Sequence, residues 1–516
     1  MCISVSNRRK IGGNDILKRA CGILLPVSSL PGHYGIGCFS SRAYEFVDRL
    51  KKAGQSYWQI LPLGPTGFGD SPYQAFSSFA GNPYFIDLDE LVKQGYLNAD
   101  ELAKTDWGSD EASVDYGKIW QNRWPALKKA FLAFRAKGNP EQFEEDRKSL
   151  DPETREFCLY QAIKDSEGGK PWQEWEDSVR LRKPEALEKA RDAFKEEIAF
   201  YEWIQTEFNR QWTRLKKYAN AAGIEIIGDM PFYVAPDSAC AWAHPELFQF
   251  NEDRKPVRVA GCPPDYFSPD GQFWGNPVYD WEYHRKTGYA WWISRIKYAL
   301  SLYDYVRVDH FRGFDEYYAI PAENKNARNG KWEKGPGMEI FREMQDQLSS
   351  KYSTLPIIAE DLGLMTESVL KLVRDSGFPA MKVLEFAYDS DNRNLYLPHN
   401  YIRNCVAYTG THDNQPLMGW ICGMNKDTRL HMIRYQGGEH TPENDLYWDC
   451  IRTVLSSIAD TAIIPMPDYL GLGDEGRINT PSSVNGNNWK WRMKENAFSD
   501  DLICHCDMLS GLYGRK

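Results

Sequence analysis

The sequence predicts an α/β fold, a (β/α)8 TIM barrel that carries inserted, mainly helical subdomains. Eight short apolar runs with strand character alternate with helical patterns along the 516 residues. Four of these runs end in an acidic side chain. Barrels of this class collect their working residues at the C-terminal ends of the strands, and four unrelated surface ion pairs would not need this common position.

The expected elements follow in chain order. Strands are expected at 22–27, 57–63, 224–233, 305–311, 356–361, 381–387, 405–411 and 461–469. Helical spacing of apolar residues marks the segments between them, including a long helix at 194–222 and a helix at 366–376 with Thr366 as its N-cap.

Three regions are expected from these patterns. Residues 20–85 form the first part of the barrel, 86–193 an inserted helical subdomain, and 194–516 the rest of the barrel. The insert is charged and helix-forming and lacks the pattern of a strand ending in an acid. Residues 234–283 read as a long irregular loop rich in Pro, Gly and aromatic residues, and loops of that length in compact domains are usually functional.

Composition narrows the classes of partner. Hydrophobic residues make up 42% and charged residues 26% of the chain, as in ordinary globular proteins, and the net charge of −10 argues against nucleic acid or an anionic membrane. No apolar run approaches the ~20 residues that span a bilayer, and the first twenty residues lack an apolar signal-peptide core. Eleven scattered cysteines without CxxC pairs favour reduced thiols and a cytoplasmic location.

Aromatic residues are abundant outside the expected elements. The chain has 18 Trp, 29 Tyr and 24 Phe, and many stand beside Gly, Pro or Asn, as in Tyr266-Phe267 and Phe273-Trp274. Flat apolar rings next to polar groups suit a sugar, whose C–H faces stack on rings while its hydroxyls form hydrogen bonds.

The acidic strand ends are the candidate chemical groups. On strand 305–311, Arg307 and Asp309 alternate with two valines and therefore share one face. A cation beside Asp309 keeps its carboxylate ionised, as a nucleophile or a metal ligand requires. The other strands end in Asp229, in Glu360 with Asp361, and in Asp413.

Two chemistries fit three carboxylates on one face of a barrel. One is glycosidic bond cleavage, in which one acid is the nucleophile or base and another donates a proton. The other is a divalent metal site that holds an enolate, for which the strand Met381-Lys382-Val383-Leu384-Glu385 could fill the gap between the acidic strand ends. Lys382 and Glu385 are expected as strand residues without an assigned role. A non-catalytic glucan-binding protein would need the rings without the acids. The aromatic loops favour the glycosidic reading.

Several sequence blocks resemble the 4-α-glucanotransferases called amylomaltases, of the α-amylase clan. The blocks are Ser71-Pro-Tyr73-Gln, Gly228-Asp229-Met-Pro231, Pro263-Pro-Asp-Tyr266-Phe267-Ser, Trp274-Gly-Asn276-Pro, Arg307-Val-Asp309-His310-Phe-Arg-Gly, Ala359-Glu360-Asp361-Leu-Gly363, Gly410-Thr-His412-Asp413-Asn414 and Ile478-Asn-Thr-Pro481. They occur in the family's order through nearly the whole chain, which resembles its compact form. The segment Ser482–Trp489 fits the family pattern poorly.

The resemblance implies roles for individual residues. It places the nucleophile on Asp309, the acid/base on Glu360 and the transition-state stabiliser on Asp413, in a retaining double displacement without cofactor or metal. The expected substrate-binding residues are Ser71, Tyr73, Asp229, Tyr266, Phe267, Trp274, Asn276, Arg307, His310 and His412. The implied partners are maltooligosaccharides and starch- or glycogen-derived α-glucans, with glucose as an acceptor. An α-glucan hydrolase of the same clan stays open as an alternative.

Overall fold

The computed structural model describes residues 17–137, 140–264, 269–363, 365–483 and 486–516. Its central sheet has eight parallel strands in the order β10-β11-β12-β1-β2-β3-β6-β9. These strands are β1 (Ala20–Leu24), β2 (Tyr57–Gln59), β3 (Glu225–Met230), β6 (Tyr305–Val308), β9 (Ile357–Ala359), β10 (Ala380–Val383), β11 (Cys405–Tyr408) and β12 (Thr461–Pro465). The N–H of Ala359 donates to the carbonyl of Pro379 at 2.9 Å beside the two end strands. The sheet is therefore a nearly closed barrel. Each of the eight expected strands is confirmed, because a strand of this sheet overlaps each expected range.

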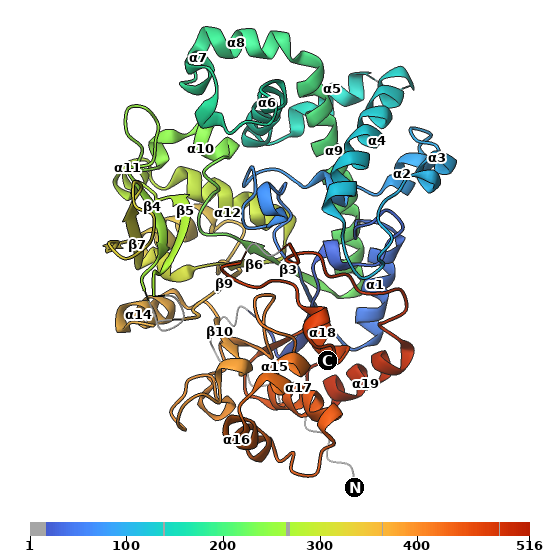
Figure 1. Cartoon of the computed structure of the whole chain (residues 1–516), viewed down its shortest axis with the longest axis vertical. Helices are drawn as coiled ribbons and strands as arrows, with labels where there is room; N and C mark the ends of the chain where they lie inside the picture. Colours follow the sequence, from blue (N-terminus) through green and yellow to red (C-terminus); the bar gives the residue numbers. More distant parts are fainter. Residues whose placement is uncertain (1–16, 138–139, 265–268, 364, 484–485) are drawn as a thin grey trace.

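Helices surround the barrel and connect its strands (Figure 1). They are α1 (Ser41–Lys52), α9 (Lys195–Ala222), α12 (Ala290–Leu302), α13 (Met338–Leu348), α14 (Glu367–Ser376), α15 (Leu417–Gly423), α16 (Lys426–Gln436), α17 (Leu446–Ser456), α18 (Met466–Tyr469) and α19 (Asp500–Leu512). The expected N-cap forms, because the side chain of Thr366 accepts from Val369 N. Gly223 ends α9 with a left-handed φ of 88°. Between β10 and β11 the chain uses only the short 3-10 turns η7 (Leu384–Phe386) and η8 (Pro398–Asn400).

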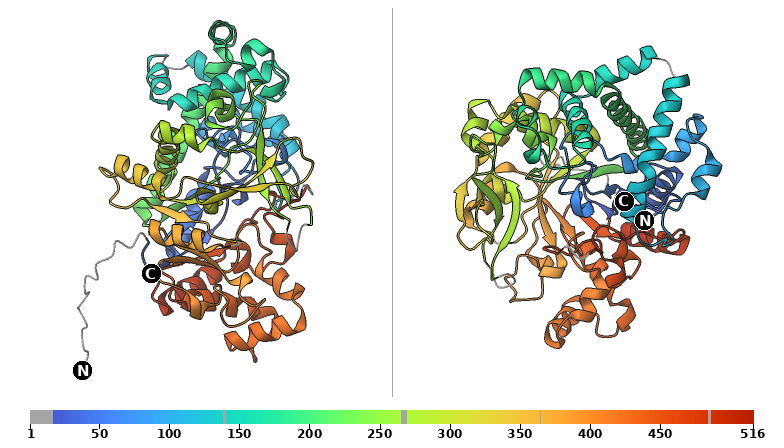
Figure 2. Two further views of the ribbon diagram at one scale, coloured as in Figure 1. Left: turned by 90° about the vertical axis from the view of Figure 1, so that its left-hand side faces the viewer. Right: turned by 45° about the horizontal axis from the view of Figure 1, so that its top comes forward.

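The stretch after β2 is helical, as its charged sequence suggests. It contains α2 (Leu88–Lys93), α3 (Ala99–Lys104), α4 (Tyr116–Lys137), α5 (Pro140–Ser149), α6 (Pro152–Ser166), α7 (Asp177–Arg180) and α8 (Pro184–Ala193). Helices α5 to α8 gather at one end of the molecule, beyond the barrel, in both Figure 1 and Figure 2.

Residues 234–283 are not the irregular loop that was expected. They contain α10 (Ala239–Ala243), β4 (Arg258–Cys262), β5 (Gln272–Pro277) and the start of α11 (Trp281–Lys286). The two strands join β7 (Glu316–Pro321) and β8 (Lys331–Lys334) in an antiparallel sheet of order β5-β4-β7-β8. The expectation was wrong because Pro and Gly weaken the sequence pattern of a strand. In addition, β4 pairs with β7, which lies far from it in the sequence.

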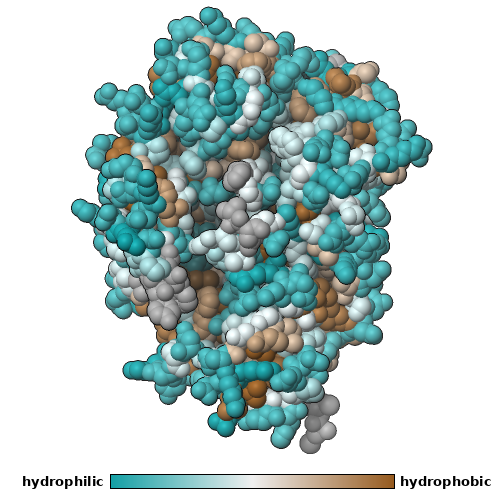
Figure 3. Space-filling model, viewed as in Figure 1, coloured by the Kyte–Doolittle hydropathy of each residue, from teal (hydrophilic) through white to brown (hydrophobic). Residues whose placement is uncertain are grey.

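The face viewed in Figure 3 is largely hydrophilic and hollowed near its middle. Among the described residues, no helix combines the length and the hydropathy that a bilayer span requires.

Candidate active site

Strand β6 carries Arg307 and is followed directly by Asp309. Val306 and Val308 are buried on one face, so Arg307 and Asp309 share the other. The register of β3 and β6 sets Asp229 opposite Arg307. Nη1 of Arg307 contacts Oδ2 of Asp229 at 2.7 Å, and Nη2 contacts Oδ1 of Asp309 at 3.0 Å. One buried guanidinium thus joins carboxylates from two strands.

The members of this ion cluster differ in their access to solvent. The Asp229 side chain is 0% exposed and that of Asp309 is 32% exposed. Burial opposes the charge of Arg307, but Asp229 and Asp309 raise the pKa of its guanidinium well above the usual value. Burial raises the pKa of Asp229, against the lowering effect of Arg307. Asp309 is therefore the carboxylate that a ligand can reach. Asp229 is buried and holds the guanidinium of Arg307 that contacts Asp309.

Glu360 follows β9 immediately. Its Oε2 accepts from the N–H of His310 at 2.7 Å, and its Oε1 accepts from the N–H of Leu362 at 2.7 Å. Burial and the negative charge of Asp309 raise the pKa of Glu360 to about 7, against the lowering effect of Arg307 and of the two N–H groups. At neutral pH a large fraction of Glu360 therefore holds a proton that it can donate.

His310 lies between the two sheets of the protein. Its backbone is left-handed, with φ 46° and ψ 46°, which turns the chain sharply after Asp309. Trp274 of β5 meets the imidazole edge to face, with ring centroids 5.1 Å apart at 87°. Burial lowers the pKa of His310 to about 4, so its ring is neutral at neutral pH. The antiparallel sheet thus brings an expected sugar-binding ring against the barrel.

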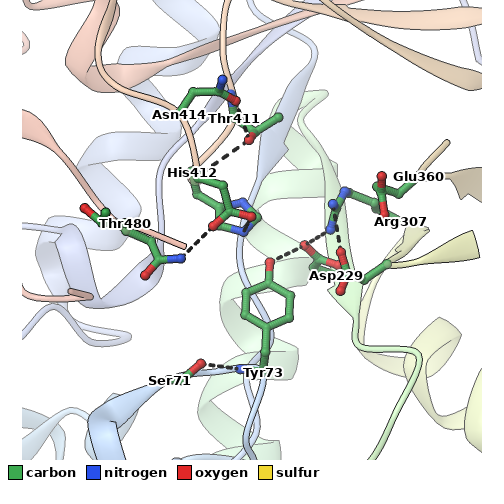
Figure 4. Close-up of polar contacts among 12 residues, drawn as sticks. Ser71, Tyr73, Asp229, Arg307, Glu360, Thr411, His412, Asn414 and Thr480 are labelled. Carbon is green, nitrogen blue, oxygen red and sulfur yellow. Dashed lines mark hydrogen bonds and ion pairs between the residues drawn. The ribbon is translucent and has the colours of Figure 1, made fainter. Parts of the chain in front are cut away.

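Tyr73 connects the two halves of the site (Figure 4). Its hydroxyl donates to Oδ2 of Asp229 at 2.7 Å. Its ring stacks on His412, with centroids 5.2 Å apart and planes 14° apart. Trp489 packs beside both rings at 5.8 Å and 6.0 Å. The loop after β2 therefore supplies a flat ring between the Arg307 cluster and the loop after β11.

Asp413 lies on the loop after β11. Its Oδ1 accepts from Nδ2 of Asn479 at 2.6 Å, and its Oδ2 lies 3.5 Å from Nε2 of His412. The Asp413 side chain is 44% exposed, whereas that of His412 is 3% exposed. Asn479 and His412 therefore contact the carboxylate of Asp413, which stays partly exposed to solvent.

Of the four remaining expected binding residues, two form hydrogen bonds with the protein backbone and two lie outside the described part of the chain. The Ser71 hydroxyl accepts from the N–H of Tyr73 at 3.3 Å, so Ser71 shapes the turn that presents the ring. Asn276 is buried, and its amide donates to the carbonyl of Val234 at 2.8 Å. Tyr266 and Phe267 lie outside the described residues.

Sequence reasoning left three residues around the site without a role. Asn479 stands in the Ile478–Pro481 block that carries part of the family resemblance, which is a usable signal. Trp489 falls in the poorly fitting segment, and nothing local pairs it with Tyr73. Glu385, treated as a strand residue, accepts from Asn414 on the Asp413 loop at 3.0 Å.

The metal alternative requires converging ligands. Within the described residues, no group of three or more His, Cys, Asp and Glu side chains is arranged to hold a metal ion. Asp309 is instead paired with a guanidinium, and Glu360 accepts backbone hydrogen bonds.

Comparisons with known proteins identify the family of the chain. The family described as 4-alpha-glucanotransferase matches residues 25–497. The 4-alpha-glucanotransferase of Clostridium butyricum is 46% identical over 496 residues, covering 95% of this chain and 99% of that protein. That of Thermus thermophilus is 45% identical over 485 residues, covering 92% and 95%. The structure of amylomaltase from Streptococcus agalactiae in complex with acarbose superposes with a TM-score of 0.92 at 39% identity, covering 96% of this chain and 100% of that one. By its sequence and its fold, the chain belongs to the 4-alpha-glucanotransferase family.

Proposed function

We propose that this 4-alpha-glucanotransferase works by a retaining double displacement on α-1,4-glucans. Asp309 attacks the anomeric carbon while Glu360 donates its proton to the glycosidic oxygen, which gives a covalent glycosyl-enzyme and releases the leaving glucan. Glu360 then takes the proton of the 4-hydroxyl of an incoming glucan or glucose, and the new glycosidic bond displaces Asp309. Acid and base are the same residue in the two halves.

The observation that carries the proposal is the contrast between the two carboxyl groups that directly follow β6 and β9. Arg307 binds Asp309 at 3.0 Å and holds its carboxylate in a charge-assisted hydrogen bond. Burial raises the pKa of Glu360 to about 7, and the charge of Asp309 adds to that rise. Carboxyl groups with different environments take different roles in glycosidases.

The remaining residues would bind the sugar between the nucleophile and the Asp413 loop. Tyr73 offers its ring to the C–H face of the sugar, and Asp413 offers its exposed carboxylate to the hydroxyls next to the reacting carbon. Neutral His310 and buried His412 offer ring nitrogens as hydrogen-bond partners. Trp274 extends the site towards the acceptor.

Transfer instead of hydrolysis is proposed to depend on the aromatic residues of 234–283. Water at about 55 M competes for the glycosyl-enzyme, so an acceptor must be held in place and stray water kept out. Tyr266→Ala and Phe267→Ala should raise the ratio of hydrolysis to transfer. An unchanged ratio with lower stability would instead make these rings purely structural.

The proposed substrates are maltooligosaccharides and starch- or glycogen-derived α-glucans, with glucose as an acceptor. The test is incubation with maltotriose alone, with free glucose, longer oligomers and total reducing ends measured together. Disproportionation leaves total reducing ends constant. If they rise as fast as longer chains form, the chain is a hydrolase of the same clan.

Asp309→Ala tests the nucleophile. It should abolish turnover and leave maltooligosaccharide affinity nearly unchanged, and a variant with wild-type rates would exclude Asp309. The matched control is Asp304→Asn at the opposite end of the same strand, where Asp304 accepts from Ile226 N at 2.8 Å. The control should retain wild-type activity per folded molecule.

Activity after exhaustive dialysis with EDTA tests the metal alternative, and full activity is expected. Loss of activity with EDTA and its recovery with Mg²⁺ or Mn²⁺ would support a metal-dependent, enolase-type enzyme.

The cytoplasmic location stays a prediction from cysteine usage, and cell fractionation tests it.

A further inference from the structure

Two acidic residues flank the loop that carries His412 and Asp413. The loop follows β11, whose neighbours in the sheet are β10 and β12. Asp468 lies in α18, the short helix after β12, and it accepts from the hydroxyl of Thr409 at 2.6 Å and from the N–H of Leu417 at 2.8 Å. It therefore holds both ends of the loop.

Glu385 follows β10 and holds the middle of the same loop. Its Oε2 accepts from Nδ2 of Asn414 at 3.0 Å. Oδ1 of Asn414 accepts from the Thr411 hydroxyl at 2.9 Å and from the Thr411 N–H at 3.0 Å. The Thr411 oxygen in turn accepts from the N–H of Asp413 at 3.2 Å. A continuous chain of hydrogen bonds therefore runs from Glu385 through Asn414 and Thr411 to the backbone of Asp413.

The fit around Glu385 is close. A Cβ on Gly410 would lie 2.6 Å from Oε1 of Glu385 and 3.1 Å from Cβ of Asn414, so a larger residue there would have to displace the Glu385 carboxyl group. Oε1 is shut off from solvent and has no hydrogen-bond partner among the described residues. An ionised carboxylate would leave a full charge without donors at this oxygen, which a neutral acid avoids.

The charges that face Glu385 also favour its neutral form. Burial raises the pKa of Glu385 well above its usual value, and the carboxyl of Asp468 raises it further. The Asn414 hydrogen bond and the charge of Arg477 oppose this rise without reversing it.

We propose that Glu385 is a positioning residue that, as a neutral carboxylic acid, holds Asn414 and thereby orients Asp413 and His412 for the glycosyl-transfer steps. The inference rests on the proposed function, because it gives Glu385 its importance through Asp413. Oε1 of Glu385 is shut off from solvent and Oε2 accepts from Asn414, so the role assigned to Glu385 is to position the loop and not to bind the sugar directly.

The test compares Glu385→Gln with Glu385→Ala in the intact protein, using maltotriose disproportionation. Gln keeps a neutral acceptor for Asn414, so its kcat should stay within about 3-fold of wild type. Ala frees Asn414, and a loop displaced by part of an ångström should lower kcat by about 10- to 100-fold with KM nearly unchanged. Glu202→Gln is the control, since Glu202 is another buried glutamate, located on α9 and paired with Arg147.

Melting temperatures between pH 4 and 8 test the neutral state. As pH rises above the ordinary carboxyl value of about 4.3, the unfolded chain loses the Glu385 proton while the folded chain keeps it. Wild type therefore loses stability that Glu385→Gln does not lose. The melting temperature of the variant minus that of wild type should grow by about 1–3 °C over this range.

Each outcome decides. Wild-type kcat in Glu385→Ala, an equal loss in Gln and Ala, or a pH-independent melting difference would overturn the proposal. Should Glu385→Ala fail to fold, Asn414→Ala breaks the same chain of hydrogen bonds at a half-buried residue, and a wild-type kcat in Asn414→Ala would also overturn the proposal.

Asp413→Asn separates this proposal from the proposed function. Full activity in Asp413→Asn refutes the proposed role of Asp413, whereas an inactive Asp413→Asn with an active Glu385→Ala refutes only the role of Glu385.

Discussion

Arg307→Met should show how far one cation stabilises both the fold and the reaction. The substitution removes the partner of Asp229, whose side chain has no exposed area, and of Asp309, whose side chain is 32% exposed. Removing one partner of a buried ion pair costs about 3–5 kcal/mol. The solvent-screened contact with Asp309 adds about 0–1 kcal/mol. The loss is expected to come almost entirely from Asp229.

The pH dependence of that loss follows from the remaining carboxyl group. Burial already raises the pKa of Asp229 in the presence of Arg307, so without the cation its pKa rises further. The folded variant then binds a proton more tightly than the unfolded chain, whose Asp titrates near about 3.9. Stability of the variant therefore falls as pH rises above that value. The deficit against wild type should be larger at pH 8 than at pH 5.

The assay combines denaturant unfolding at pH 5 and pH 8 with glucose release from maltotriose. We expect kcat to fall by at least about 10²-fold, because a preorganised donor beside the nucleophile is lost. Arg307→Lys keeps a charge but not the planar fork that reaches both acids, so it should recover only part of the stability. A Met variant within about 1 kcal/mol of wild type at both pH values would refute the reasoning.

Three further predictions concern other contacts of the site. Because Glu360 must be protonated to donate and its pKa is raised to about 7, kcat/KM should fall about tenfold per pH unit above pH 7; a flat profile to pH 8.5 would contradict this. Asn479→Ala removes the 2.6 Å hydrogen bond to Asp413, and kcat should drop about 10-fold at little cost in KM, whereas an effect on KM alone would indicate a ground-state contact. Trp274→Ala removes the ring against His310 and should increase total reducing ends formed per transfer, as measured with maltotriose; an unchanged ratio would limit Trp274 to a structural role.

Much of the barrel was predictable from the sequence because its signals are local. A short run of apolar residues determines a buried strand, and alternation along it determines which side chains share a face. Parallel strands bring their C-terminal ends to one rim, so Asp229, Asp309, Glu360 and Asp413 could be assigned to a common site before their contacts were known.

The antiparallel sheet shows where local signals fail. Residues 258–262 and 272–277 carry Gly and Pro, and their pairing partner β7 begins at Glu316. A strand that depends on such a distant partner leaves no periodic pattern strong enough to outweigh its turn residues. The contact of Trp274 with His310 depends on this sheet, so the sequence did not predict it either.

Sequence alone therefore determined the fold class, the four acidic strand ends and the family resemblance. Tertiary structure decided the partners of those acids: Tyr73 for Asp229, Asn479 for Asp413, and Asn414 for Glu385. Strand periodicity depends on residues that are neighbours in the sequence, so a few consecutive residues are enough to recognise it. A hydrogen bond between distant strands depends on where the closed sheet places each end, and so do the pKa shifts that burial and neighbouring charges impose on Glu360 and Glu385.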